Sequence, residues 1–573
     1  MSFGNEDQNS SKNFIIAMVL FMVIMFGYEY FSGNKNQNTN VQNTEEVVSE
    51  QENTRDDSNN QKTEVLEKKL LTIDEALNDP NRVSLENAHM RGSINLCGGV
   101  IDSIILKDYK ESTDENSKNV MLLTPKNTEH QFYYAISYND ITNKELISEE
   151  SIWTSDTPES GKQSVVLKTQ TQKGLIIERT ITFDDNYLIN IKDKIINISN
   201  QPIELKSSSD LIRFLPKHND YAVVHEGLVG CGENKVQEIK YKDIDDKTSF
   251  KRCSWLGYTD IYWLTALING KNNIVNYSTI GDDCYKITSL KPRDLKISPN
   301  SITELNYQLF TGPKDIQILK NYKNDKNFEK FDMAIDFGWF FIITKPLIQL
   351  VDLLAKIFSN MGIVILVLTL MFKFITYPLM KKSFISAAKM KEIQPKIASL
   401  QKLYANDKVR MNQEMMALYK KEQVSPMSGC LPMLLQAPIF FCLYKVFFIS
   451  IDMRQAPLFG WVHDLSAPDQ LYIFNLFGAI DWTPPSFLQI GVWPLIMGLT
   501  MFLQQKLTTI GKKKKVIITE KTSEQKMQDS MMLIMPIMFT YICSSFPVAV
   551  VIYWTISNLF SMIQQYYVNR KIK

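Results

Sequence analysis

A lysine lies inside an apolar segment that is about long enough to cross a bilayer. Lys373 follows the run GIVILVLTLMF and precedes FITYPLM, within residues 362–380. At about 1.5 Å of rise per helical residue, it lies roughly 17 Å from Gly362 and roughly 12 Å from Lys381. A cation at that depth is costly unless it faces water or a polar cavity, so it predicts a functional path. The alternative is a lysine whose stem bends toward the headgroups.

Two further polar side chains share this environment. Gln436 lies early in the next apolar segment, at a depth comparable to that of Lys373. Thr369 precedes Lys373 by four residues, which is one helical turn. Two facing polar groups could share a wet cavity, so we predict a hydrophilic groove near Thr369, Lys373 and Gln436. Thr500 and Thr540 more simply bond their own helix backbone.

The sequence predicts no catalytic, metal or cofactor site. The sequence contains no GxxxxGK[ST] nucleotide-binding motif. Four histidines of the polar part lie too far apart in the sequence for metal-ligand spacing: His89, His130, His218 and His225. A carbohydrate-type binding face or a hydrolytic site stays an alternative to a purely structural domain around them. Four cysteines in the same part form no CxxC, and their pairing cannot be deduced: Cys97, Cys231, Cys253 and Cys284. We expect a protein that is not an enzyme.

Composition divides the chain into two unlike parts. Among 573 residues, 63 Lys and Arg nearly balance 62 Asp and Glu, so no global charge favours nucleic-acid recognition. The mean hydropathy of −0.15 averages a mostly polar part, up to about residue 330, with a remainder dominated by apolar runs. This composition indicates a membrane protein with a large soluble insert.

The amino-terminal apolar run is expected to be an uncleaved signal anchor. It ends in bulky side chains where a cleavage site needs small ones. We assign 1–12 to a cytoplasmic amino terminus, 13–31 to transmembrane helix 1 and 32–69 to a disordered periplasmic tether that is rich in Asn, Gln, Glu and Ser.

Period-2 alternation predicts an antiparallel β-sandwich over residues 70–325. In GLIIERTITF, the side chains of Leu175, Ile177, Ile181 and Phe183 share one side, and Tyr187, Ile189 and Ile191 alternate again after an Asp-Asp-Asn turn. Similar short runs recur without a long helical pattern between them, which is typical of a sandwich.

The remainder predicts five further spans, for six transmembrane helices in all. An apolar run interrupted by charges predicts an interfacial amphipathic helix at 331–360. The spans are expected at 361–380, 429–450, 486–505, 529–546 and 547–566. Between them lie a cytoplasmic helical hairpin at 381–428, a loop at 451–485, a basic loop at 506–528 and a tail at 567–573.

Basic residues orient these spans. The hairpin carries ten basic against four acidic residues, and the 506–528 loop is rich in lysine, so both are expected in the cytoplasm. The 451–485 loop, whose only basic residue is Arg454, is then periplasmic. Both termini would be cytoplasmic and the sandwich periplasmic.

At this point the chain resembles a known family. LTLMFKFITYPL, QEMMALYKKEQVSPMSGCLPMLLQAPIFFCLY, RQAPLFGWVHDLSAPD, MPIMFTYICSSFP and VIYWTISNLFSMIQQ are similar to successive signatures of the YidC-type membrane protein insertases, in the YidC/Oxa/Alb family. The first span and the exported domain resemble the Gram-negative form. The resemblance implies five core helices around a groove that opens to the cytoplasm and the lipid, in the bacterial inner membrane. The family's groove cation is usually arginine, and Lys373 keeps its charge but not its planar fork.

The residues and the resemblance together predict how the protein works. A polar segment of a nascent membrane protein would enter the groove, and the substrate helix would slide past Phe440, Tyr553 and Trp554 into the lipid bilayer. The tip of the hairpin, with Asn406, Lys408 and Arg410, would capture the substrate first. The Sec translocon and the ribosome are expected partners. A secondary transporter or channel that uses Lys373, and an envelope-binding protein that acts through its sandwich, are the alternatives.

Overall fold

The computed structural model describes residues 70–155, 163–216, 224–233, 235–244, 249–250, 252–269, 274–280, 284–291, 295–338, 340–404, 406–424, 431–480, 482–509 and 523–572. The predicted signal anchor at 13–31, the tether at 32–69 and most of the basic loop at 506–528 lie outside these residues. The chain forms two compact units that divide between Asp336 and Phe337.

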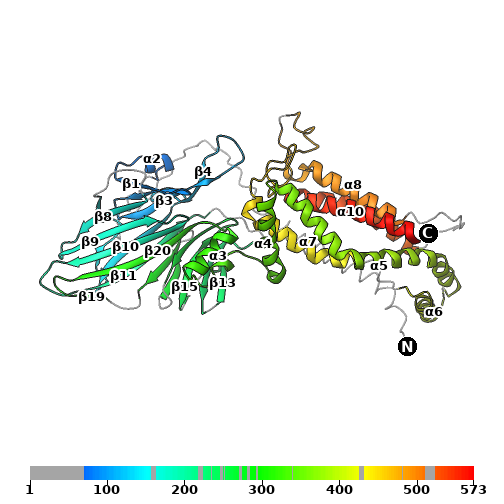
Figure 1. The fold of residues 1–573 in the computed structure, drawn as a ribbon, viewed down its shortest axis with the longest axis horizontal. Helices are drawn as coiled ribbons and strands as arrows, with labels where there is room; N and C mark the ends of the chain where they lie inside the picture. The colour runs from blue at the N-terminus through cyan, green and yellow to red at the C-terminus, as the bar shows by residue number, and fades with distance from the viewer. Residues whose placement is uncertain are drawn as a thin grey trace, which may run out of the picture. The chain divides into compact units, whose positions relative to one another are not determined.

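The first unit is built from two antiparallel sheets (Figure 1). The path through the eleven-stranded sheet runs β1-β2-β3-β5-β11-β18-β17-β14, with β4, β6 and β19 paired at its sides. The nine-stranded sheet runs β13-β12-β15-β16-β20-β10-β9-β8-β7. The antiparallel sandwich predicted from the sequence is confirmed.

The strands of the eleven-stranded sheet are β1 (Arg82–Glu86), β2 (Met90–Asn95), β3 (Val100–Lys110), β4 (Asn119–Leu123), β5 (Phe132–Asp140), β6 (Glu145–Ile147), β11 (Ile203–Phe214), β14 (Ser249–Phe250), β17 (Ile274–Ile280), β18 (Cys284–Leu290) and β19 (Leu295–Ile297). Those of the nine-stranded sheet are β7 (Thr154–Ser155), β8 (Ser164–Gln170), β9 (Leu175–Phe183), β10 (Leu188–Asn197), β12 (Gly227–Gly232), β13 (Lys235–Lys240), β15 (Cys253–Thr259), β16 (Trp263–Ile268) and β20 (Ile302–Pro313).

The β9–β10 hairpin forms as its alternation predicts. Its inward apolar side chains are at most 2% exposed. The Asp184 carboxylate closes the turn, since Oδ1 accepts hydrogen bonds from the backbone N–H groups of Asn186 and Leu188, each at 2.9 Å. A short Asp side chain that bonds the backbone two residues on is a common turn device. Local chemistry thus fixes the register of this hairpin.

A buried ion pair inside the sandwich was not expected from the sequence. Arg179 lies in the inward register of β9, is 1% exposed in its side chain, and its Nη2 donates to Asp193 Oδ2 at 2.8 Å. Tyr138 of the opposite sheet donates to the same carboxylate oxygen at 2.6 Å. Removing one partner of such a pair is strongly destabilising, because the other charge stays buried. The network therefore ties the two sheets together.

Aromatic packing extends the first unit beyond the predicted end of the sandwich at 325. Two short helices belong to the unit, α2 (Ile73–Leu77) and α3 (Ile316–Asp325), and a 3₁₀ turn follows at Phe331–Ala334. Phe331 is fully buried, with its ring 5.2 Å from that of Trp255 and 5.1 Å from that of Phe310. The interfacial helix predicted at 331–360 is thus too long, because its first residues complete the sandwich core.

The second unit is helical. Its helices are α4 (Phe341–Ile357), α5 (Met361–Leu403), α6 (Lys408–Lys421), α7 (Leu431–Ile449), α8 (Val492–Thr509), α9 (Ser523–Ile542) and α10 (Val548–Ile572). Helix α10 packs against α5 and α8, and α4 packs against α7. Figure 1 shows α5, α8 and α10 running side by side.

Several helices continue past the predicted span ends. Helix α5 runs 43 residues without a break at 380, because the residues that follow are helix-forming and Pro378 interrupts only locally. It begins with the Asn360 side chain accepting from the backbone N–H of Gly362 at 2.8 Å. Helix α8 begins at Val492 rather than 486, because a 3₁₀ turn follows Pro485. Helices α9 and α10 are separated by a 3₁₀ turn at Cys543–Ser545.

Candidate functional site

Helix α5 buries the one charge of its apolar part while large apolar side chains beside it are exposed. Lys373 is 7% exposed, whereas the neighbouring Phe374 and Ile375 are 75% and 70% exposed. In the described chain, Met361–Met390 is the helical stretch that is long and apolar enough to cross a membrane, with a mean hydropathy of 2.1. Apolar helical stretches at Gln436–Ile449 and Leu533–Ser545 are shorter. A helix of this kind suits a lipid solvent.

The Lys373 ammonium group is held by helix α10. Its Nζ donates to Ser561 Oγ at 2.8 Å, and no salt bridge joins it to a described carboxylate. Gln564, one turn further on, donates from Nε2 to the Lys373 carbonyl at 3.4 Å, while its Oε1 is buried with no partner in the described chain. An ammonium has three donors. Beside Lys373, the site therefore holds spare donors and one unused acceptor.

Gln436 of α7 bonds the same helix two turns earlier. Its Nε2 donates to the Tyr553 hydroxyl at 2.7 Å, and Tyr553 is 1% exposed. Lys373 and Gln436, which were predicted to share a polar cavity, thus each donate to a hydroxyl of α10, and a common groove for them stays a prediction. We call the α10 residues Tyr553, Ser557, Ser561 and Gln564 the polar seam, because their spacing of four, four and three places them on one helix face.

Sequence reasoning missed Ser561 and Gln564. The available signal was the helical spacing from Tyr553, which puts a polar residue on each successive turn of an otherwise apolar segment. Thr369, by contrast, was predicted as a groove residue but is fully buried and donates to the Ile365 carbonyl of its own helix at 2.7 Å. Thr500 and Thr540 likewise bond their own helices, as expected.

The residues predicted to guide a substrate helix do not all lie together. The rings of Phe440 and Trp554 are 4.8 Å apart, and Phe539 lies 5.2 Å from Trp554. Phe440 is 5% exposed, whereas Trp554 is partly exposed. Tyr553 belongs to the polar seam through its bond to Gln436. The partly exposed edge of this aromatic group is therefore the indole of Trp554.

The predicted capture tip lies between α5 and α6. Asn406 is exposed, and Lys408 is the first residue of α6. The Arg410 guanidinium lies 5.5 Å from the centre of the Tyr404 ring. An exposed salt bridge between Lys396 Nζ and Glu422 Oε1, at 2.6 Å, joins the two arms and holds the pKa of the Glu422 carboxyl below its usual range.

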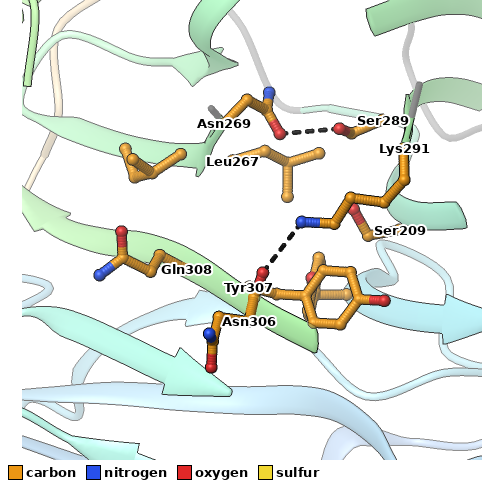
Figure 2. A pocket seen from close by; sticks show the side chains of 10 residues that line it. Ser209, Leu267, Asn269, Ser289, Lys291, Asn306, Tyr307 and Gln308 are labelled. Carbon is orange, nitrogen blue, oxygen red and sulfur yellow. Dashed lines mark hydrogen bonds between the residues drawn. The ribbon is translucent and has the colours of Figure 1, made fainter. Parts of the chain in front are cut away.

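A small polar hollow lies between strands of the sandwich. Lys291 Nζ donates to the Asn306 carbonyl at 3.1 Å and lies 4.9 Å from the Tyr307 ring centre, and Ser289 donates to Asn269 Oδ1 at 2.7 Å (Figure 2). Burial lowers the pKa of the Lys291 ammonium. The hollow holds about 10 Å³, which is room for about one water molecule. A sugar does not fit in it.

No metal or disulfide chemistry emerges in the described chain. It contains no group of three His, Cys, Asp or Glu placed to bind a metal ion. Cys97, Cys231, Cys253 and Cys284 are free thiols, and burial raises the pKa of the last three. A buried thiol with a raised pKa is inert.

A polar seam buried among apolar helices, in a chain that also carries a large antiparallel sandwich, defines a membrane protein with a folded soluble domain. Comparisons with known proteins agree. Residues 353–573 match the family model of the 60Kd inner membrane protein, and residues 82–350 match that of the YidC periplasmic domain.

The curated relatives match along nearly their whole length. A membrane protein insertase YidC of Rickettsia massiliae is 37% identical over 98% of this chain and 99% of its own. That of Rickettsia canadensis is 38% identical with the same coverage. A solved structure of an active YidC insertase with its first transmembrane domain resolved has a TM-score of 0.36 and 16% identity, covering 85% of this chain and 92% of that one. The chain belongs to the YidC-type membrane protein insertase family.

Proposed function

We propose that this chain inserts membrane proteins into the bacterial inner membrane and helps them to fold, using the polar seam as the lining of a hydrophilic groove. The observation that carries the proposal is the buried Lys373 ammonium, bonded to Ser561 in the middle of an apolar helix. A buried cation without a carboxylate partner is expensive to keep. A buried Lys373 is explained if its ammonium group binds polar groups of an incoming polypeptide.

The seam matches the chemistry of a polypeptide. Lys373 has spare donors for a carboxylate or a carbonyl, and Gln564 Oε1 can accept from a backbone amide. A translocated segment carries both kinds of group, and acidic side chains would gain most. Each group that is bonded in the groove escapes part of the cost of crossing about 30 Å of hydrocarbon.

The substrate's own apolar helix would leave sideways into lipid. Large apolar side chains are exposed on α5 and α9, including Phe374, Ile375 and Ile537 at 75%, 70% and 66% exposure. In a bilayer these faces would contact acyl chains. We assign Trp554 to the surface along which the substrate helix slides, with the buried Phe440 and Tyr553 packed behind it. Burial of the substrate helix in hydrocarbon supplies the driving force.

The proposed topology has six spans. Besides the signal anchor, these contain the apolar parts of α5, α7, α8, α9 and α10, with both chain ends in the cytoplasm and the sandwich in the periplasm. The distribution of basic residues supports this orientation. Helix α4 would lie in the interface, since its charged and apolar residues alternate at helical spacing.

The α5–α6 hairpin would receive the nascent chain at the cytoplasmic mouth of the groove. Its tip, with Asn406, Lys408 and Arg410, is basic and polar, and the described side chains of α6 are mostly exposed. Elements with few buried contacts open at low free energy. The ribosome and the Sec translocon are the partners we propose at this step, together with the lipid bilayer.

Reconstitution tests the proposal against its rivals. The purified chain in liposomes should insert a small single-span protein, measured by protease protection of its translocated end. A secondary transporter or channel would instead give solute or ion flux without insertion. An envelope-binding protein that acts through its sandwich would give neither, and either result would overturn the proposal.

A further inference from the structure

The connection between α7 and α8 carries a group of exposed apolar side chains. The proposed roles of the groove and of the α5–α6 hairpin do not involve these side chains. We call residues 472–490 the apolar tip. Its large apolar side chains are about half exposed: Phe474 45%, Leu476 59%, Phe477 54%, Ile480 46%, Trp482 47% and Phe487 57%. Between Gln470 and Gly491, Asp481 is the one charged residue. Exposed apolar groups of this size mark interaction sites.

The base of the tip is firmly built. The Asp469 carboxylate is 3% exposed and accepts hydrogen bonds from the backbone N–H of Trp493 at 2.7 Å and from Trp461 Nε1 at 3.0 Å. Tyr472 and Gly491 form a β-bridge, and the Val492 N–H donates to the Leu471 carbonyl at 3.1 Å. The two ends of the tip therefore meet beside Val492, the first residue of α8.

The backbone of the tip is held in a conformation that bulky residues avoid. Leu476 and Phe477 have φ of 49° and 59°, in the left-handed region. The turn is closed by the Phe477 N–H, which donates to the Tyr472 carbonyl at 3.0 Å, and by the Gly478 N–H, which donates to Asn475 Oδ1 at 3.1 Å. Such a conformation costs about 1–3 kcal/mol per residue and persists where the surroundings impose it. The strain turns two large apolar side chains outward together.

We propose that the apolar tip inserts into the outer leaflet of the bilayer, at the boundary between headgroups and acyl chains. This inference rests on the proposed topology, which places the start of α8 at the outer membrane surface. The two ends of the tip are paired beside the first residue of α8, and half of the tip reaches at most about 34 Å when fully extended, so the tip stays next to that end of the helix. Trp and Tyr are enriched at membrane interfaces, and the tip carries Tyr472 and Trp482 beside its apolar side chains.

Charge favours lipid over a protein partner. The tip offers no basic residue to a partner's carboxylates, and its one acidic residue would meet no attraction from anionic headgroups, so apolar burial is the interaction that remains. Inserted in this way, the tip would hold the outer ends of α7 and α8 against the bilayer while the groove between α5 and α10 accepts a substrate. The proposal concerns anchoring and not the passage of the substrate.

The test places an environment-sensitive dye on the tip. Phe477→Cys, labelled with NBD in a Cys97→Ser, Cys430→Ser background, is compared with Ser112→Cys, an exposed polar position in a turn of the sandwich. In phosphatidylcholine–phosphatidylglycerol proteoliposomes, we expect blue-shifted emission at 477, quenched by shallow spin-labelled lipid and protected from aqueous iodide. The dye at 112 should show the reverse.

Two results would overturn the proposal. Equal quenching by iodide at 477 and 112 would leave the tip in water, and protection from both iodide and lipid quenchers would mean that protein covers it. Insertion of a single-span substrate is measured in the same vesicles. Normal insertion with an iodide-accessible tip rejects the anchor alone, whereas a lipid-quenched tip without insertion rejects the proposed function alone.

Discussion

Replacing Lys373 with methionine should slow insertion of acidic translocated segments and spare neutral ones. Methionine keeps much of the volume of the lysine stem and removes the ammonium, so the packing of α5 on α10 is retained. Ser561 then loses its charged partner but can bond its own helix backbone, as buried serines do. The seam stays folded and loses only its cation.

The size of the effect follows from the bonds that are lost. A hydrogen bond to a charged group is worth about 1.5–3 kcal/mol. If a substrate carboxylate makes one such bond to Lys373 in the rate-limiting state, the insertion rate falls about ten- to a hundredfold. A substrate with a neutral translocated segment can lose at most an ammonium–carbonyl hydrogen bond, without the added attraction between two opposite charges, so its insertion rate should fall by less than that of the acidic segment. Lys373→Arg should retain insertion, whereas Lys373→Glu should be at least as impaired as Lys373→Met.

The assay is protease protection of a single-span substrate in proteoliposomes, with acidic and neutral versions of its translocated segment. Lys445→Met is the matched control, because Lys445 is a buried cation on α7 at 6% exposure and lies outside the polar seam. Equal loss for acidic and neutral segments would refute the charge-based argument. So would unchanged insertion of the acidic segment at equal abundance of all variants.

Four further results are expected. Deleting residues 70–313, through the end of β20 so that no strand is left unpaired, should leave insertion largely intact, as measured in the same proteoliposomes; complete loss in a stably expressed deletion would move function into the sandwich. Joining Lys396→Cys and Glu422→Cys with a reducible bifunctional thiol reagent, in place of the hairpin salt bridge, should slow insertion until the link is reduced. A cysteine at Asn406 should crosslink to nascent substrate before one at Thr369, and the reverse order would make the hairpin a spacer. Tyr553→Phe should cost about 1 kcal/mol of unfolding free energy, because the partly buried Gln436 Nε2 loses its acceptor, and Tyr553→Phe in a Gln436→Leu background should cost less. Burial lowers the pKa of the His225 imidazole in the folded chain, so the unfolded chain takes up a proton first as pH falls below about 6.5. The melting temperature should therefore be highest above that pH and fall below it. The same plot of melting temperature against pH should be flatter for His225→Gln.

The sandwich could be predicted because its information is local. The alternation in β9 and β10 and the Asp184 turn specify a hairpin without reference to the rest of the chain. The pairing of β5 with β11 joins segments about seventy residues apart and leaves no local trace. Arg179 occupies an inward position, yet its charge alone would have placed it outside. The fold tolerates it only because Asp193 and Tyr138 lie opposite.

The site could be predicted only in part, for a related reason. Lys373 stands out because a charge in an apolar run is rare. Ser561 does not, because a serine in a membrane helix usually bonds its own backbone. Its role depends on the packing of α10 on α5, which no spacing within either segment reveals. Gln436 was predicted from its depth alone to share a polar environment with Lys373, and its bond to Tyr553 could not be predicted, since depth along a helix does not fix the direction that a side chain faces.

The surroundings of Lys373 fit an ammonium group, although the family resemblance of the sequence implies arginine at this position. Ser561 Oγ satisfies one donor of an ammonium at 2.8 Å. A guanidinium has five donors in a fixed plane and needs more acceptors. Gln564, one turn along the same face, donates to the Lys373 carbonyl at 3.4 Å, so its side chain lies beside the same turn of α5. Lys373→Arg therefore tests whether charge and hydration, rather than a planar two-point grip on a carboxylate, carry the proposed function.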